Sequence, residues 1–130
     1  MVTGGFPVPS IFGPYSPIRQ AGSFYYVSGQ VGVDPATGQC GRTIEEQTSQ
    51  VMTNIKTVLS SAGLSMDHVV KTTIYVKDMA NFTRVNDVYA GFFETPRPAR
   101  GTVGVKDLPH VGGKTEIMVE IEAIAYKDPE

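Results

Sequence analysis

Two segments of the chain carry apolar residues at the spacing of an amphipathic helix. The first follows Thr43 and Glu46, whose spacing suits a capping box in which each side chain bonds a free amide at the helix start. Gly63 can end this helix, because glycine readily adopts the left-handed terminal conformation. Its apolar positions are Val51, Ile55, Val58, Leu59 and Ala62.

The second helix is predicted between a polar cap and a pair of prolines. Asp78 or Asn81 can cap its start, and Pro96 and Pro98 end it, because the residue before a proline resists helical geometry. Its apolar positions are Phe82, Val85, Val88, Tyr89, Phe92 and Phe93.

Short extended segments surround the helices. Residues 16–19 and 24–28 flank a break at Ala21-Gly22 and predict a hairpin. A further short piece covers 31–33 and precedes a turn over 34–38. The β-branched run 69–76 and the segments 100–105 and 116–126 complete the predicted strands. The element order is therefore β-β-(β)-α-β-α-β-β.

Side chains of the last strand alternate between two faces. One face carries Ile117, Val119, Ile121, Ala123 and Ala125, and the other carries Met118, Glu120, Glu122, Ile124 and Tyr126. We therefore expect an α+β domain in which two helices cover one face of a sheet. The second face needs a cover of its own, and self-association is the usual way to provide one.

Length and composition indicate one folded domain. The 130 residues suit a single domain over 1–130, in which the Gly- and Pro-rich segment 1–13 is expected to be irregular. A formal net charge of −2 does not indicate the basic surface that binds nucleic acid or an anionic membrane. The single cysteine, Cys40, excludes an internal disulfide, and no apolar run resembles a secretory signal or a membrane span. These features predict a cytoplasmic protein.

The common catalytic motifs are missing. The two histidines, His68 and His110, have no metal-ligand spacing, and we expect both at the surface. Arg100, at the start of an apolar strand, is the most unusual charge, because a planar guanidinium there can clamp a carboxylate. Glu120 and Glu122 interrupt the last strand, where charges usually face solvent. Residue types alone thus indicate only a small-acid site.

Several motifs together resemble the RidA (YjgF / L-PSP) family, in that family's order and over most of the chain. They are Gly13-Pro14-Tyr15-Ser16, Ser28-Gly29-Gln30, Asp34-Pro35-Ala36-Thr37-Gly38, Val70-Lys71-Thr72-Thr73, Val85-Asn86-Asp87-Val88-Tyr89, Pro98-Ala99-Arg100 and Glu120-Ile121-Glu122-Ala123-Ile124-Ala125. The resemblance implies a chorismate-mutase-like α+β fold and a homotrimer with clefts between subunits. It also implies hydrolysis of reactive enamines and imines such as 2-aminoacrylate to 2-oxo acids and ammonia, without a metal or organic cofactor.

The resemblance assigns roles to particular residues. Arg100 would bind the substrate carboxylate, and Glu120 would position or activate water. Tyr15 would line the cleft, with Ser28 and Gly29 beside the ligand. Two candidates remain. Asn86 is a polar neighbour in the motif, although it can equally well bond the backbone or lie in the subunit interface. Thr102 would form a small, hydroxyl-bearing part of the cleft wall. Tyr15 could instead be an ordinary core or interface aromatic, Ser28 and Gly29 could simply end a strand, and Glu122 is expected to be structural.

Two departures from the family pattern affect these assignments. Gly101 and Thr102 replace the residues that usually follow the arginine, and Gly101 and Gly104 can loosen this strand or mark a bulge. The link 110–119 is longer than usual and is predicted to extend a hairpin tip. Its register decides on which side of the last strand Glu120 lies.

Three other functions are open at this point. A trimer that binds small acids without turnover would use Arg100 equally well. Ribonuclease or translation-inhibitor activity fits poorly, because the chain is acidic and has no basic stripe. Its two histidines also do not form a pair suited to general acid–base cleavage of RNA. Chorismate mutase activity is suggested by fold analogy alone. Its doubly charged substrate would need more positively charged residues in the cleft than the sequence can be expected to place there.

Overall fold

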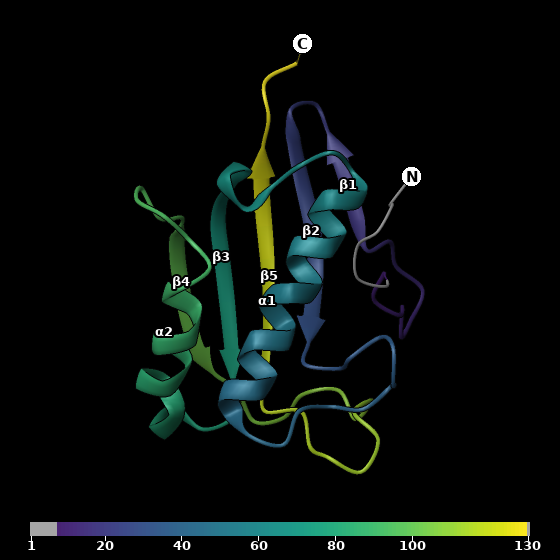
Figure 1. Ribbon diagram of the computed structural model, residues 1–130, viewed down its shortest axis with the longest axis vertical. Coiled ribbons are helices and arrows are strands. Elements are labelled where there is room, and N and C mark those ends of the chain that lie inside the picture. Colours follow the sequence, from purple (N-terminus) through teal and green to yellow (C-terminus); the bar gives the residue numbers. More distant parts are fainter. Residues whose placement is uncertain (1–7, 130) are drawn as a thin grey trace.

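The computed structural model describes residues 8–129 and contains five strands and two helices there (Figure 1). Within the predicted irregular segment, residues 8–13 form no helix or strand, and residues 1–7 lie outside the described part. The elements are β1 (Ile18–Ala21), β2 (Phe24–Val31), α1 (Ile44–Ser61), β3 (Val69–Val76), α2 (Phe82–Ala90), β4 (Ala99–Gly104) and β5 (Val119–Tyr126). Single 3-10 turns, Met66–His68 and Met79–Asn81, precede β3 and α2.

The strands form one mixed sheet in the order β1-β2-β5-β3-β4. β3 and β4 are parallel and α2 connects them, whereas the other neighbouring pairs are antiparallel. The predicted hairpin between the last two strands is therefore wrong. The crossover through α2 places β4 outside β3, so β5 pairs with β2 and β3 instead, and residues 105–118 pass beneath the end of β3 as a long connection.

Both helices lie on the same face of the sheet (Figure 1), as the sequence predicts. The capping box of α1 is present: the Thr43 hydroxyl accepts a bond from the Glu46 amide at 3.0 Å, and the Glu46 carboxylate accepts one from the Thr43 amide at 3.2 Å. The main core joins α1 and α2 to the inward side chains of β3 and β5; its most buried members include Val51, Ile55, Leu59, Ile74, Val119 and Ile121. Among the described residues, no helix is both long and apolar enough to cross a bilayer.

The opposite face of the sheet is left uncovered in the single chain. The alternation predicted for β5 is confirmed: Val119, Ile121, Ala123 and Ala125 are buried beneath the helices. Strand pairing then places a group of largely apolar side chains together on the other face. They are Phe24, Tyr26, Tyr75, Val103, Ile124 and Tyr126. Tyr26 and Val103 are each 46% exposed, so this face offers a surface for another molecule.

Several predicted boundaries shift. The second helix ends at Ala90, before Phe92, Phe93 and the prolines, although Phe93 still packs into the core. Asp78 caps the 3-10 turn before α2, because its carboxylate accepts a bond from the Ala80 amide. The last strand begins at Val119, since residues 116–118 belong to the long connection. The third extended piece is the end of β2 followed by a bridge between Val33 and Cys40.

A buried glutamine ties α1 to the long connection. The side chain of Gln47 is fully buried, donates to the carbonyls of Gly41 (2.9 Å) and Glu116 (2.8 Å), and accepts from the amide of Met118 (2.8 Å). Gln47 therefore serves three backbone groups that have little access to water.

We expect Gln47→Ala to lower the free energy of unfolding by about 2–3 kcal/mol, because it strands these backbone groups and leaves a small cavity. Urea unfolding measures the change. Gln50→Ala is the matched control, since Gln50 makes only a side-chain bond to Asn54. A loss at Gln47 no larger than at Gln50 would show that water replaces the missing bonds.

Candidate active site

A cavity of about 350 Å³ opens between the N-terminal segment, β2, β5 and the long connection. Four of the predicted site residues line it: Tyr15, Ser28, Gly29 and Glu120. We call these four the cavity group. Three others, Asn86, Arg100 and Thr102, lie outside it.

A bulge in β2 shapes the middle of the cavity. Val27 pairs with Ala123 and Gln30 with Ile121, so Ser28 and Gly29 together stand opposite the single residue Glu122. The Ser28 hydroxyl donates to the carbonyl of Ser16 at 2.6 Å, which fixes the bulge against the preceding segment. Gly29 lies so close to Glu120 that an added Cβ would overlap the carboxylate.

Glu120 faces the cavity from the centre of the sheet. It pairs with Val31 on one side and Tyr75 on the other, which settles the register question raised by the long link. Burial raises the pKa of Glu120, and the nearby Glu122 carboxylate raises it further. A glutamate with a raised pKa is a better proton acceptor near neutral pH than an ordinary one.

Arg100 lies on the opposite face of the sheet. It pairs with Thr72, whose hydroxyl bonds the Tyr89 hydroxyl (2.7 Å) beneath α2. The guanidinium carbon is 5.0 Å from the ring centre of Tyr89 and 5.5 Å from that of Phe82. No carboxylate of the described residues lies within ion-pair distance of this guanidinium. Aromatic stacking thus holds its position while leaving its donors without an anionic partner.

Asn86 and Thr102 lie on the same side as Arg100. Thr102 pairs with Ile74, which is buried beneath the helices. Helical spacing places Asn86 between Phe82 and Tyr89 on one face of α2. The Asn86 Oδ1 atom is buried and has no hydrogen-bond partner within residues 8–129. We call Asn86, Arg100 and Thr102 the edge group, because β4 is an outer strand of the sheet.

Sequence reasoning missed several residues of the cavity wall. Glu122, expected to be structural, lines the cavity and acts on the pKa of Glu120. Apolar wall residues come from the N-terminal segment, the end of β2 and the long connection: Pro9, Phe12, Val31, Val33, Pro109 and Val111. The unusual length of the link was the one signal that pointed to Pro109 and Val111.

The other chemically notable side chains do not line this cavity. Cys40 is buried, and desolvation raises the pKa of its thiol to about 11, so it is not a thiolate nucleophile at neutral pH. His110 bonds the Asp107 carboxylate at 3.1 Å, and His68 Nδ1 accepts from the Ser65 amide at 2.9 Å. No group of three or more metal-ligating side chains occurs within residues 8–129.

Gly29→Ala tests the close approach between the bulge and Glu120. We expect the methyl group to displace the carboxylate. For any reaction that uses Glu120, kcat/KM should then fall by at least about tenfold, with little loss of stability. Gly91→Ala is the matched control, because Gly91 is exposed just after α2 and a Cβ there meets only the Val88 carbonyl, at 3.6 Å. Equal activity of both variants would show that the position of Glu120 is unimportant. Steady-state kinetics and thermal melting supply both readouts.

Comparison with known proteins agrees with this geometry. The family model described as endoribonuclease L-PSP matches residues 8–127. The chain belongs to the endoribonuclease L-PSP family. The resemblance to RidA and YjgF proteins is thereby confirmed.

Relatives in the L-PSP family carry two kinds of description. A RutC family protein of Pyrococcus horikoshii is 45% identical over 121 residues, covering 92% of each chain. A 2-iminobutanoate/2-iminopropanoate deaminase of Capra hircus is 43% identical over 123 residues, covering 93% of this chain and 85% of that protein.

Solved structures of the family share the fold. RidA from an Antarctic Psychrobacter superposes with a TM-score of 0.86 at 36% identity, covering 92% of this chain and 94% of the other. E. coli TdcF with bound serine superposes with a TM-score of 0.84 at 32% identity, covering 97% and 100%. The expected α+β fold is therefore confirmed.

Proposed function

We propose that this protein hydrolyses reactive 2-imino acids, and the enamines in equilibrium with them, to 2-oxo acids and ammonia. Water adds to the electrophilic C2 of the iminium, a C–O bond forms, and the C–N bond then breaks. The iminium acid plus water gives the 2-oxo acid plus ammonium, so atoms and charge balance. The observation that carries the proposal is Glu120, a half-buried carboxylate with a raised pKa, held against Gly29 in a cavity.

Glu120 is suited to handle the water of this reaction. Its carboxylate can accept a proton from water as that water attacks, and can return a proton to the departing nitrogen. Little further machinery is required, since the iminium carbon is already electrophilic. Tyr15 and Ser28 would border the same substrate from the N-terminal segment and the bulge.

The substrate carboxylate requires a cation, and Arg100 is the residue we assign to it. Within one chain Arg100 and Glu120 lie on opposite faces of the sheet, so they cannot both touch one small molecule. The proposal therefore takes Arg100 from a neighbouring copy of the chain. The edge position of β4 and the lack of an anionic partner for Arg100 support this arrangement.

A homotrimer would bring the two groups together, as the family resemblance implies. The uncovered sheet face, with Tyr26, Tyr75 and Ile124, is an apolar surface that such an assembly would bury. We expect light scattering at micromolar concentration to give the mass of three chains. A stable monomer would remove the basis for a site shared between copies.

The direct test couples the protein to a source of imine. A serine or threonine dehydratase releases the unstable intermediate, and 2-oxo acid formation is followed with and without the protein. We expect faster release with the wild-type chain and a much smaller acceleration with the same amount of Glu120→Gln. Identical rates with and without wild-type protein would refute the proposed function.

Binding without turnover is the second candidate, because one relative's structure holds serine. It predicts ligand binding with no effect on imine decay in the same assay. RNA cleavage, the activity named in the family description, is disfavoured by the cavity itself. Within one chain the described lining residues include two carboxylates and no histidine, lysine or arginine. Arg100 of a neighbouring copy would add one positive charge, which leaves no excess of positive charge for a phosphodiester and no histidine for general acid–base cleavage.

A further inference from the structure

We propose that Val111, on the connection between β4 and β5, is a specificity-determining residue that selects acids with apolar side chains of three or four carbons. The inference rests on the proposed function, because it takes the reacting carbon to lie at Glu120. The wall that Val111 forms with Val31 and Val33 would be the side-chain pocket for the substrate.

One end of the cavity is continuous with a small apolar cluster separate from the main core. Val31, Val33, Cys40 and Ile117 form this cluster, with the half-buried side chains of Leu108 and Val111 packed against it. Two members of the cluster, Val31 and Val33, also line the cavity, as does Val111. A ligand reaching this end would therefore contact aliphatic carbon from β2 and from the long connection.

The polar side chain bonded to this part of β2 already has its own partners. Asn54 lines the cavity, but its amide nitrogen donates to the carbonyls of Val31 (3.1 Å) and Val33 (3.0 Å). Its amide oxygen accepts from Gln50 at 2.8 Å. A polar substrate side chain would compete with these bonds to gain a partner from Asn54, whereas an apolar one leaves them intact, so this end of the cavity favours an apolar side chain.

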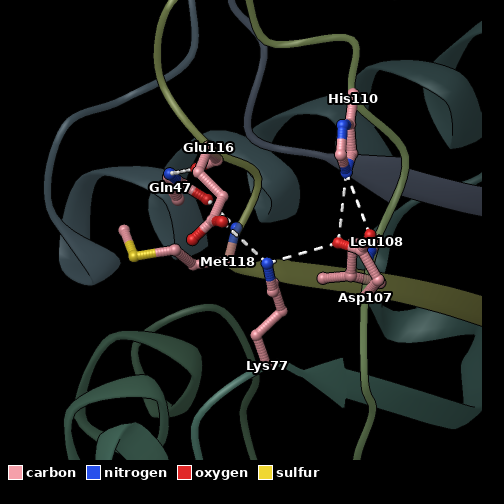
Figure 2. Close-up of polar contacts among 7 residues, drawn as sticks. All are labelled: Gln47, Lys77, Asp107, Leu108, His110, Glu116 and Met118. Atoms are coloured by element: carbon pink, nitrogen blue, oxygen red, sulfur yellow. Dashed lines mark hydrogen bonds and ion pairs between the residues drawn. The ribbon is translucent and has the colours of Figure 1, made fainter.

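Both ends of the connection are tied to the rest of the fold (Figure 2). Lys77, just after β3, contacts the carboxylates of Glu116 at 2.7 Å and Asp107 at 3.2 Å. Gln47 holds the Glu116 carbonyl and the Met118 amide from α1. The wall that carries Val111 is thus positioned before a ligand arrives, which reduces the ordering cost of binding.

Register gives the direction in which a substrate would extend. Glu120 pairs directly with Val31, so the apolar end begins beside the carboxylate. An acid whose C2 lies at Glu120 would pass its side chain over Val31 toward Val111. The cavity of about 350 Å³ is also much larger than a three-carbon acid needs, since a water molecule occupies roughly 30 Å³.

Calorimetric binding of 2-oxo acids, the product class, tests the pocket without requiring turnover. The probes are pyruvate, 2-oxobutanoate and 4-methyl-2-oxopentanoate. For the wild-type protein we expect affinity to rise about threefold to fourfold for each added carbon that is buried. Val111→Phe should weaken binding of 4-methyl-2-oxopentanoate at least about tenfold and that of pyruvate less than about threefold.

Two further variants control for folding. Val70→Phe is the matched control, because Val70 is an exposed valine of β3 outside the cavity, and it should bind all three acids as the wild type does. Val111→Ala, which cannot overfill the site, should weaken only the longest acid, by about threefold. Thermal melting shows that each variant is folded.

The outcomes separate this inference from the proposed function. Affinity that is independent of side-chain length, or losses at Val111 that are equal for all three acids, would overturn the inference even if imines are hydrolysed. Length-dependent, Val111-sensitive binding without any acceleration of imine decay would support the pocket and refute the deaminase.

Discussion

Glu120→Gln is expected to lower kcat for imine hydrolysis by about 100-fold or more, within the range typical of general acid–base groups. The amide keeps the shape of the side chain and loses the proton acceptor. Binding of 2-oxo acids should change little, so the effect should fall on kcat rather than on KM. Glu122→Gln is the control, because Glu122 lines the same cavity and the proposal gives it no proton to transfer. Equal losses in the two variants would contradict the role of Glu120.

The pH dependence follows from the raised pKa of Glu120. The active form is the carboxylate, so kcat should fall as pH decreases through this pKa, at a higher pH than for an ordinary glutamate. The folded state holds this proton more tightly than the unfolded state. The group therefore favours folding most below its unfolded pKa, and that contribution is lost as pH rises through the folded pKa. Glu120→Gln should accordingly be at least as stable as the wild type at neutral pH, which thermal melting can check.

Arg100→Ala is expected to lower kcat/KM by roughly 30- to 1000-fold, the equivalent of losing one or two charge-assisted hydrogen bonds, or about 2–4 kcal/mol. Arg100→Lys should recover only part of the loss, because an ammonium cannot pair with a carboxylate as a fork. Lysine also stacks less well on Tyr89 and Phe82, which hold the guanidinium in place.

Arg97→Ala is the control for Arg100, since it removes a nearby exposed arginine outside β4. Light scattering must first show that each variant keeps the assembly of the wild type. Full activity of an assembled Arg100→Ala variant would leave Arg100 as a structural residue packed against α2.

The alternation of apolar and polar residues along β5 was the most informative pattern in the sequence. Apolar residues at every second position of β5 identified its buried side, and Glu120 was thereby placed on the other. The capping box at Thr43 and the β-branched run of β3 fixed two further elements, because both signals are local. Local signals did not give the strand order. The sequence therefore suggested a hairpin between β4 and β5, although β3 lies between them.

The division of the candidate site into two groups could not be predicted either. It depends on the pairing of Arg100 with Thr72 and of Glu120 with Tyr75, which are contacts between segments far apart in the chain. Motif resemblance put all seven candidates into one site without saying which face each occupies. Only the pairing shows that Arg100 lies beneath α2 while Glu120 lies on the uncovered face.

Mixed oligomers of two inactive variants test the central claim, a hydrolytic site completed by a neighbouring copy. Glu120→Gln and Arg100→Ala chains are combined in equal amounts, unfolded and reassembled, and imine hydrolysis is measured. Each chain lacks a different half of the site, so random trimers should regain about a quarter of intact sites and a corresponding share of wild-type activity. Activity no greater than the sum of the two separate variants would contradict the account.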